Sequence, residues 1–579
     1  MDHRITPLLT DQYQISMAYS YFISNSHNDR ATFELFFRKN PFHGEYAIFA
    51  GIGQFMEFLV NFHYTENEIN FLKQTLPNAD PLFFEYLISL DYSMLTVKAP
   101  VEGQIVFANE PLLVISGPLG FVQLLETTAL TLINFATLVT TNACRFRMAA
   151  HPEFSNLQLT RQADVKLFVK NCINSVHLLE FGLRRAQGID GGLSASKYAM
   201  MGGFNSTSNI EAARRCGMLP SGTVAHSFIM SFSESLEIYV KNHSLGEGFT
   251  QFVSRCLFWR QFLFQSKNSI FMQYCANESE LTSFAVFAYT QPKNFTVLVD
   301  TYNILDSGVH NFIIVALSLI ELSYKPKGLR IDSGDLCYFS KQTRDLLDSV
   351  DILMVEAFKS ITNKNYEHEI AQAKIVVSND ITEEVLYQLI KDSAKINAYG
   401  IGTHLVTCKS QPALGGVFKL VEKSGIPKMK LSAEKGKATI AGAKEVYRLF
   451  LSNGEPFDDL ICSPEEQAPQ LGEIIICIHP QDELLRVKIL PAKVERLFID
   501  YILDGKLLYP HKTDNSNFIK LIHKTVEEIR QEVIERMYYL RPDHKRAVNP
   551  APYKVSLSEN MSMQQRKISL ESKSIPLIQ

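Results

Sequence analysis

The segment GLRIDSGD, residues 328–335, shows the pattern that decides the predicted fold: a short apolar run that ends at charged residues and glycine. The pattern occurs five more times, and helix-like stretches separate the copies. Strands that alternate with helices in this way are typical of a parallel sheet with right-handed crossovers. We therefore predict an α/β fold with a parallel barrel. The other copies are LLEFGLRR (178–185), GTVAHS (222–227), TVLVDTY (296–302), KIVVSND (374–380) and NAYGIGTH (397–404).

Charged or polar side chains follow each of these predicted strands. In a parallel barrel the carboxyl ends of the strands lie on one face, where active sites are built. Asp and Asn at such points are also common helix N-caps, but capping does not explain two arginines and a histidine. This face is therefore the candidate functional site. Its residues are Glu180, Arg184, His226, Asp300, Arg330, Asp332, Asp335, Asn379, Asp380 and Thr403.

The composition gives no sign of a nucleic-acid or membrane surface. The 579 residues include 57 basic and 61 acidic side chains, for a net charge of −4. The longest apolar runs, such as residues 312–320, are too short to span a bilayer, and the N-terminus does not have the pattern of a signal peptide. Nine scattered cysteines form no C-x-x-C pair, which favours a reducing compartment. We expect a cytosolic protein.

Changes in composition and periodicity along the chain predict five regions. Residues 1–150 mix strands such as ATFELFFR (31–38) with helices, and residues 178–420 carry the barrel pattern. Residues 421–550 return to hairpins and one amphipathic helix. Residues 551–579 are rich in Ser, Lys and Gln and are expected to be a frayed tail. Residues 151–177 are an atypical insert, for the reason given below.

Five motifs together resemble the nicotinate phosphoribosyltransferases of the animal type. The resemblance implies an irregular parallel α/β barrel of the type II phosphoribosyltransferase kind, with a flanking α+β domain built from both chain ends. It also implies synthesis of nicotinate mononucleotide and pyrophosphate from nicotinic acid and phosphoribosyl pyrophosphate, coupled to ATP hydrolysis, in NAD biosynthesis. The motifs are LLTDQYQISMAYSYF (8–22), EFGLRRAQGIDGGLSASKYAMMGGFNSTSN (180–209), GTVAHSF (222–228), LRIDSGDL (329–336) and GIGTHLVT with PALGGVFKLV (400–407 and 412–421).

The resemblance assigns catalytic roles to three residues. His226 holds the place of the family's phosphorylated histidine, and neutral imidazole is a competent nucleophile near pH 7. Asp300 resembles the carboxylate that holds this histidine by its other ring nitrogen; its alternative role is a strand-end cap. Asp332 is expected at the ribose or at magnesium-linked contacts.

Five residues are expected to bind the base and the neighbouring anionic groups. Arg184 and Arg330 would hold carboxylate or phosphate through paired hydrogen bonds, although a surface ion pair is the usual role of arginine. Tyr13 would reach the pyridine ring from the other subunit of a homodimer, and Phe181 would stack on the opposite face or simply pack in the core. Ser208 stands where nicotinamide-using relatives carry Asp. A neutral side chain there favours the nicotinate carboxylate.

Further residues are expected at the phosphates. Gly334, Asn379 and the loop of Gly400, Gly402 and Thr403 resemble the site of the ribose and its 5′-phosphate. Arg38 and Lys430 would bind the phosphates of ATP. Mg²⁺, or Mn²⁺ in its place, would be held mainly by substrate phosphates and water, so no protein metal-ligand motif is expected.

Two departures from the family leave alternatives open. The stretch SNLQLTRQADVKLFVKNCINSV is extra and directly precedes the strand with Arg184, and His404 follows Thr403 where a small residue is expected. The insert would suit a catalytically impaired relative that acts as a scaffold. Another base, nicotinamide or quinolinate, is the other alternative. Ser208 argues against nicotinamide, and the length of the match argues against quinolinate.

Overall fold

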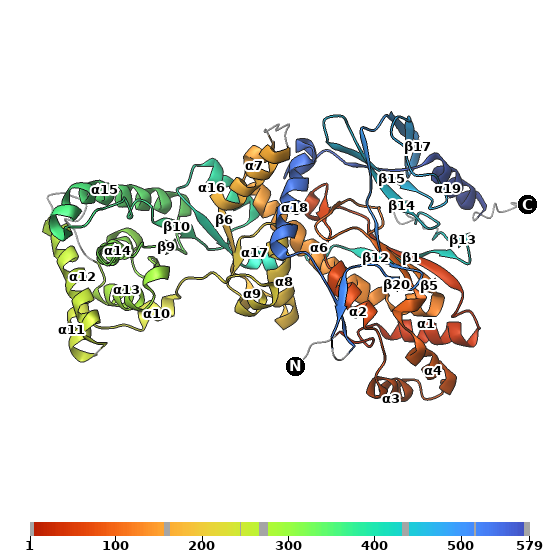
Figure 1. Cartoon of the computed structure of the whole chain (residues 1–579), viewed down its shortest axis with the longest axis horizontal. Helices are drawn as coiled ribbons and strands as arrows, with labels where there is room; N and C mark the ends of the chain where they lie inside the picture. The colour runs from red at the N-terminus through yellow and green to blue at the C-terminus, as the bar shows by residue number, and fades with distance from the viewer. Residues whose placement is uncertain are drawn as a thin grey trace, which may run out of the picture.

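The computed structural model describes residues 5–155, 162–243, 245–265, 276–430, 439–514 and 517–571. The molecule is elongated (Figure 1). The middle of the chain, yellow to green in Figure 1, forms one end. The two chain ends, red and blue, lie together at the other end.

The middle of the chain forms a curled sheet of six parallel strands, five of which lie in the predicted segments, whereas Ser206–Thr207 was not predicted as a strand. Its order is β7-β6-β11-β10-β9-β8, and each neighbouring pair of strands is parallel. The sheet is half of a barrel, because it ends at β7 and β8. The strands are β6 (His177–Glu180), β7 (Ser206–Thr207), β8 (Thr296–Leu298), β9 (Gly328–Ile331), β10 (Lys374–Val377) and β11 (Ala398–Ile401).

The strand predicted within GTVAHS (222–227), at Thr223–Ala225, does not form, so this prediction is wrong. The backbone at Ala225 is extended, with φ −104° and ψ 155°, but it pairs with no strand among the described residues. The hydroxyl of Thr223 instead accepts a hydrogen bond from the side chain of Arg330. The segment thus serves as an unpaired arm that leads into helix α10 (His226–Met230).

The helices that cover this sheet are apolar where they face it. Helix α14 (His310–Glu321) is buried along nearly its whole length. Together with the π-helical turn η7 (Ile304–Val309) it forms the one described helical segment that is long and apolar enough to cross a membrane. This segment, Ile304–Glu321, is longer than the apolar run 312–320 noted in the sequence. Because 83% of it is buried in the protein, it is a core helix here.

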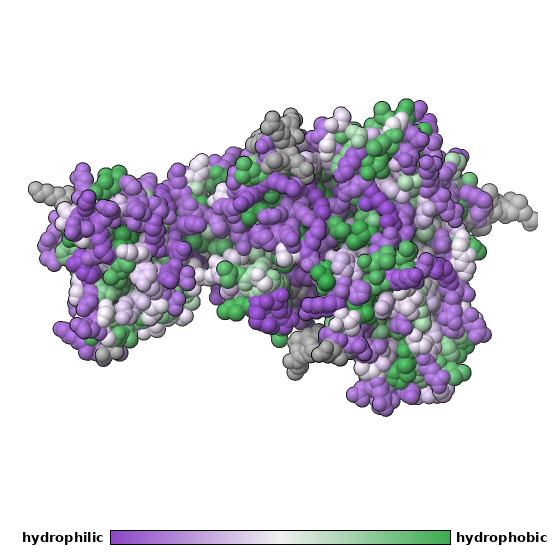
Figure 2. Space-filling model, in the orientation of Figure 1, coloured by the Kyte–Doolittle hydropathy of each residue, from purple (hydrophilic) through white to green (hydrophobic). Residues whose placement is uncertain are grey.

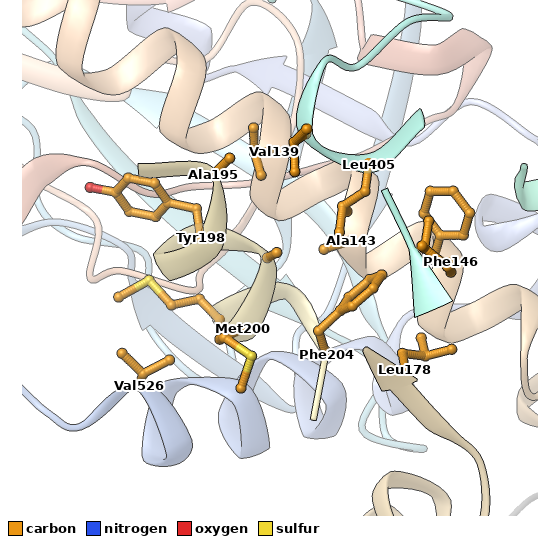
Figure 3. Close-up of a cluster of buried hydrophobic side chains, with 14 of the residues drawn as sticks. Val139, Ala143, Phe146, Leu178, Ala195, Tyr198, Met200, Phe204, Leu405 and Val526 are labelled. Atoms are coloured by element: carbon orange, nitrogen blue, oxygen red, sulfur yellow. The ribbon is translucent and has the colours of Figure 1, made fainter. Parts of the chain in front are cut away.

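The core runs from the parallel sheet into helices from both chain ends. Figure 3 shows side chains from α6 (Glu126–Ala149), β6, α8 (Gly188–Gly202), α17 (Thr403–Val406) and α18 (Val526–Tyr539) in one cluster. Phe146 of α6 and Phe204, which follows α8, meet edge to face with ring centroids 6.2 Å apart. This cluster anchors β6 and α17, the two elements that carry much of the candidate site.

A seven-stranded sheet joins the N-terminal region to later parts of the chain. Its order is β13-β12-β1-β5-β3-β19-β20. The central strand β1 (Arg30–Phe37) pairs antiparallel with β5 and with β12. Lys444 adds a buried ion pair, because its Nζ lies 2.7 Å from each carboxylate oxygen of Glu34. The other strands are β3 (Thr96–Ala99), β5 (Leu113–Pro118), β12 (Gly416–Lys423), β13 (Ile426–Pro427), β19 (Ile499–Leu503) and β20 (Lys506–Leu507).

A second six-stranded sheet contains only C-terminal strands, in the order β17-β16-β23-β15-β14-β18. Its strand β23 and the helix α19 (Glu559–Glu571) lie in the segment predicted to be a frayed tail, and that prediction is wrong for these residues because β23 pairs with β15 and β16. Figure 2 shows a mostly hydrophilic face, with apolar residues gathered over the edge strand β17, where Leu484 and Leu485 are exposed. Charged neighbours such as Arg486 and Lys488 alternate along that strand, which is how exposed edges are kept from pairing. The strands are β14 (Glu445–Phe450), β15 (Pro456–Cys462), β16 (Ile475–His479), β17 (Asp482–Ile489), β18 (Lys493–Arg496) and β23 (Lys554–Leu557).

Asp458 of this sheet predicts a pH-dependent stability. Burial raises the pKa of its carboxyl group to about 7, and one carboxylate oxygen has no hydrogen-bond partner in the described part of the chain. The unfolded chain loses this proton near pH 4, so the stabilisation from Asp458 is complete below pH 4 and is lost as the pH rises through 7. We expect Asp458→Asn, which keeps the bond from Ser556, to be more stable than the wild type at pH 8 by roughly 2 kcal/mol and not at pH 4.

The midpoint of thermal unfolding at both pH values measures this effect. The exposed Asp345→Asn on α15 (Leu336–Thr362) is the matched control. A shift of the same size at pH 4 and pH 8 would contradict the prediction.

The insert is a helix that packs away from the candidate site. Residues 156–161 of it lie outside the described residues, and α7 (Gln162–Ser175) packs against α18. The two helices share a small core that includes Val169, Cys172 and Ile534. The insert therefore extends the covering layer around α18.

Three possible metal ligands lie at the base of the insert: His151, Glu153 and Cys172. The guanidinium of Arg147 lies 3.4 Å from Nε2 of His151, and Nδ1 of His151 lies 2.9 Å from Glu153. A buried guanidinium beside the imidazole repels a divalent cation. We therefore read this cluster as a hydrogen-bonded tie between α6 and the insert.

Candidate functional site

A cavity of about 160 Å³ opens at the carboxyl ends of the parallel strands. Each wall comes from a strand end or from the loop that follows it, as expected for a parallel sheet. Nine predicted site residues line it: Phe181, Arg184, Arg330, Asp332, Asn379, Asp380, Gly400, Gly402 and Thr403. Arg185, Ser378, Ile381 and His404 complete the lining.

Arg330, at the end of β9, connects three walls of the cavity. Its guanidinium donates to Ser378 (2.8 Å), to Thr223 (3.1 Å) and to Asp332 (3.2 Å). The same group lies over the Phe181 ring, 5.2 Å from its centroid. The hydrogen bonds of Arg330 are thus all made within the cavity wall. The alternative role, an ion pair on the protein surface, is wrong for this residue.

His226 lies beside this network as the first residue of α10. Its Nδ1 is 3.1 Å from the hydroxyl of Thr301. Its Nε2 is 3.9 Å from Asp300 and 3.8 Å from Asp332. Two carboxylates on that side favour a proton on Nε2, which leaves the lone pair on Nδ1. The side chain is 40% exposed, so a reactant can reach it.

Asp300 is nearly fully buried behind His226, with 2% of its side chain exposed. Its Oδ2 accepts hydrogen bonds from the backbone of Asp332 (3.1 Å) and the hydroxyl of Ser333 (2.6 Å). Its Oδ1 has no hydrogen-bond partner among the described residues. Asp300 is not the strand-end cap, because Asn303 caps the following turn. At 3.9 Å it does not hydrogen-bond the ring of His226 either, so the closer ring contact is Thr301.

The end of β6 is built around a buried carboxylate. Glu180 accepts hydrogen bonds from the backbone of Gly182 and from the hydroxyls of Ser196 and Thr207. This fixes the turn that presents Phe181 and leads to Arg184 on η4 (Leu183–Arg185). Glu180 is therefore a structural residue of the site.

At two positions near the site, close neighbours leave no room for a side chain and so require glycine. A Cβ on Gly400 would lie 2.5 Å from the Phe181 ring, and one on Gly334, where φ is +74°, would lie 2.6 Å from the Phe339 ring. Gly400 thus lets Phe181 pack flat against β11. Gly334 does not line the cavity. Asp335 is a helix cap, because it accepts a hydrogen bond from the backbone of Tyr338 at the start of α15.

Four further predicted site residues also lie outside the cavity lining. Ser208 is exposed and donates to the backbone of Glu180 at 3.3 Å. Tyr13 is half exposed and lines a separate cavity of about 270 Å³ next to Asp11, Asn134 and Pro412. Arg38 lies at the end of β1 with its guanidinium 5.5 Å from the Phe36 ring, and Lys430 is exposed at the edge of the described residues.

Sequence reasoning missed Ser378, Thr223 and Thr301. Ser378 donates to Asp332 and accepts from Arg330, so it joins the two. It directly follows the strand KIVV, so the rule that polar residues at strand ends are candidates would have found it. Thr223 and Thr301 gave no such signal, because hydroxyls are common in loops.

Comparison with known proteins identifies the family. Three sequence models match in order: the nicotinate phosphoribosyltransferase N-terminal domain at residues 8–134, the family domain at 176–453 and the C-terminal domain at 443–565. The chain belongs to the nicotinate phosphoribosyltransferase family. The resemblance drawn from the five motifs is therefore confirmed, and the chain is an enzyme of NAD biosynthesis.

Relatives match over nearly the whole chain. The nicotinate phosphoribosyltransferase of Caenorhabditis elegans is 42% identical over 97% of this chain and 92% of its own length, and the human enzyme is 37% identical over 96% and 95%. The crystal structure of the human enzyme superposes with a TM-score of 0.77, at 34% identity, and covers 97% of this chain and 100% of the human one. A nicotinate-nucleotide pyrophosphorylase from Pyrococcus furiosus shares the fold alone, with a TM-score of 0.52 at 17% identity.

Proposed function

We propose that this nicotinate phosphoribosyltransferase couples its reaction to ATP hydrolysis through phosphorylation of His226. The observation that carries the proposal is the placement of His226 beside the cavity, partly exposed, with two carboxylates facing Nε2. The Nδ1 lone pair would attack the terminal phosphorus of ATP, and the bond to the β-phosphate oxygen would break to release ADP. Hydrolysis of the phosphorylated ring then returns imidazole and phosphate.

The cavity suits the phosphoribosyl transfer itself. The ring nitrogen of nicotinate would attack C1 of phosphoribosyl pyrophosphate, and the bond from C1 to the pyrophosphate oxygen would break. Arg330, together with Arg184 at the rim, would bind the anionic groups, and Phe181 offers a ring face. Asn379, Gly402 and Thr403 are the proposed walls for the ribose phosphate, and Asp332 for the ribose.

The residues behind His226 fit a hard cation. Oδ1 of Asp300 is a buried carboxylate oxygen to which no described residue donates a hydrogen bond, and both Asp300 and Asp332 approach Nε2 of His226. Oxygen ligands of this kind suit Mg²⁺ or Mn²⁺. Such an ion, bound with the substrate phosphates, would stabilise the charge that grows on the leaving pyrophosphate. Asp300 and Asp332 are the residues we propose to hold it, through water or directly.

The remaining proposals concern the assembly, the residues outside the cavity and the compartment. Tyr13 lies away from the cavity of its own subunit, which supports a homodimer in which Tyr13 contributes to the partner's site. The sheets built from both chain ends would then act as the flanking domain beside the half-barrel. Arg38 and Lys430 remain proposed contacts for ATP phosphates, Ser208 a proposed determinant of the choice of base, and the cytosol the proposed compartment.

The test is product formation by the purified chain. Nicotinate or nicotinamide would be supplied with phosphoribosyl pyrophosphate and Mg²⁺, with and without ATP, and mononucleotide and ADP would be measured. We expect nicotinate to be used in preference to nicotinamide, with a rate that rises with ATP, and acid-labile phosphate on Nδ1 of His226 after incubation with ATP. Nicotinate turnover that is indifferent to ATP, without ADP release, would overturn the coupling.

The insert gave the only reason to consider a scaffold protein. No residue of the described part of the insert lines the cavity, and α7 packs on α18 instead. This packing removes that reason, so we carry no second function.

A further inference from the structure

His404 occupies an unusual position in the cavity wall. It is the second residue of α17, and its ring lines the cavity with only 19% of the side chain exposed. Neither ring nitrogen makes a hydrogen bond to any described residue. Among the described residues, the one charged partner of the ring is Asp380, whose Oδ1 lies 3.5 Å from Nε2. A mostly buried imidazole without a hydrogen-bond partner is costly unless a ligand supplies one.

Asp380 is a weak partner for this ring. Its side chain is 78% exposed, so solvent screens the contact. The backbone of Asn379 and Asp380 is left-handed at both residues, with φ of +101° and +47°. Two successive non-glycine residues of this kind are rare and strained, and such strain clusters at functional sites. The turn keeps the Asp380 carboxylate at the cavity mouth, from which it can turn to water.

The other charges around His404 favour an anion in front of it. Arg184, Arg185 and Arg330 line the same cavity, and η4 packs against α17. On the remaining side, α16 (Glu383–Lys391) carries Glu383, which pairs with Arg145 of α6 at 2.8 Å, and Glu384. The pKa of Glu384 is lowered, first by the hydrogen bond from Thr382 and also by the charges of Arg145 and His404.

We propose that His404 is a phosphate-binding residue of this chain, which in its protonated form donates Nε2–H to a phosphoryl oxygen of the substrate and exchanges Asp380 for that partner. The proposal rests on the proposed function only for the identity of the ester, the 5′-phosphate of phosphoribosyl pyrophosphate. Histidine changes its charge between pH 5 and 8, unlike the three arginines. Binding of the phosphate therefore takes up a proton at pH 8 and weakens as the pH rises.

The test compares the wild type with His404→Ser and His404→Gln. A charge-assisted hydrogen bond predicts a KM for phosphoribosyl pyrophosphate about tenfold higher in His404→Ser than in the wild type at pH 6.5, with the difference shrinking by pH 8.5. His404→Gln can donate without charge and should recover part of the affinity at every pH. The substrate phosphate titrates in all three proteins, so only the difference between them is informative.

Calorimetry with ribose 5-phosphate supplies a readout that does not depend on turnover. At pH 8, in buffers of different ionisation enthalpy, binding to the wild type should take up a proton and binding to His404→Ser should not. His368→Ser removes another imidazole–carboxylate pair, with Asp351 at 2.7 Å, and is the matched control because it lies outside the cavity lining.

The outcomes separate this inference from the proposed function. Equal KM values and equal proton uptake in the wild type and His404→Ser would overturn the role of His404 while nicotinate turnover stands. If the wild type made no nicotinate mononucleotide, the calorimetric comparison would still decide whether His404 binds a phosphate ester.

Discussion

His226→Ala is expected to abolish the response to ATP. The variant should lose ADP formation by at least about 10³-fold, because it lacks the imidazole that we propose as the phosphoryl acceptor. Nicotinate mononucleotide should still form slowly, at a rate that ATP no longer raises, since the cavity and Arg330 remain. The measurement is the rate of both products with and without ATP at saturating nicotinate.

Thr301→Val provides the graded comparison for His226. It removes the 3.1 Å contact to Nδ1 but keeps the ring. The hydroxyl helps to orient the ring but donates to the Nδ1 lone pair that must attack phosphorus, so its loss predicts a change in ATP hydrolysis of no more than roughly fivefold. His243→Ala, which removes an imidazole 3.6 Å from Glu234 outside the cavity, should behave as the wild type. Retained ATP stimulation in His226→Ala would refute the phosphohistidine.

Arg330→Ala is expected to cause the largest loss of phosphoribosyl transfer. The substitution removes the donors to Ser378, Thr223 and Asp332 together and leaves the Asp332 carboxylate without its cation. It also removes a positive charge from the cavity wall that we propose to bind the anionic groups of the substrates. We expect kcat/KM for phosphoribosyl pyrophosphate to fall by about 10³-fold, which corresponds to about 4 kcal/mol.

Arg330→Lys separates charge from geometry. Lysine keeps the positive charge but cannot form three directed bonds or lie flat over Phe181. We expect it to recover no more than about tenfold of the lost activity. Circular dichroism and the thermal midpoint should show that both variants fold. A folded Arg330→Ala with activity within a factor of ten of the wild type would show that Arg330 does not bind the reacting groups.

The sequence predicted the parallel half of the fold because its signal is local. Each strand is a short apolar run bounded by polar residues and glycine, and these features need no distant partner to be recognised. The exception shows the limit of this reasoning. Thr223–Ala225 has the same texture and an extended backbone, but a strand needs a hydrogen-bonded neighbour, and none of the described strands pairs with it.

The same limit applies to the candidate site, where local patterns identify some of the residues but not the roles that their contacts give them. Strand-end position was enough to pick out Arg184, Arg330, Asp332 and Asn379, all of which line the cavity. It could not distinguish Asp335, a helix cap, from Asp332, because both follow the same strand. Nor could it find Thr301, whose hydroxyl reaches a ring 75 residues away in the chain.

By itself, the sequence determined the family, the parallel strands and most of the residues around the cavity, since motifs and periodicity are properties of neighbouring residues. Only the tertiary structure decided what those residues contact. Arg330 contacts Thr223, which is 107 residues away in the chain, and Ser378, which is 48 residues away. Strand β1 pairs with β12, although the whole parallel sheet lies between them in the sequence. Such contacts depend on how the whole chain closes on its core, which no local pattern records.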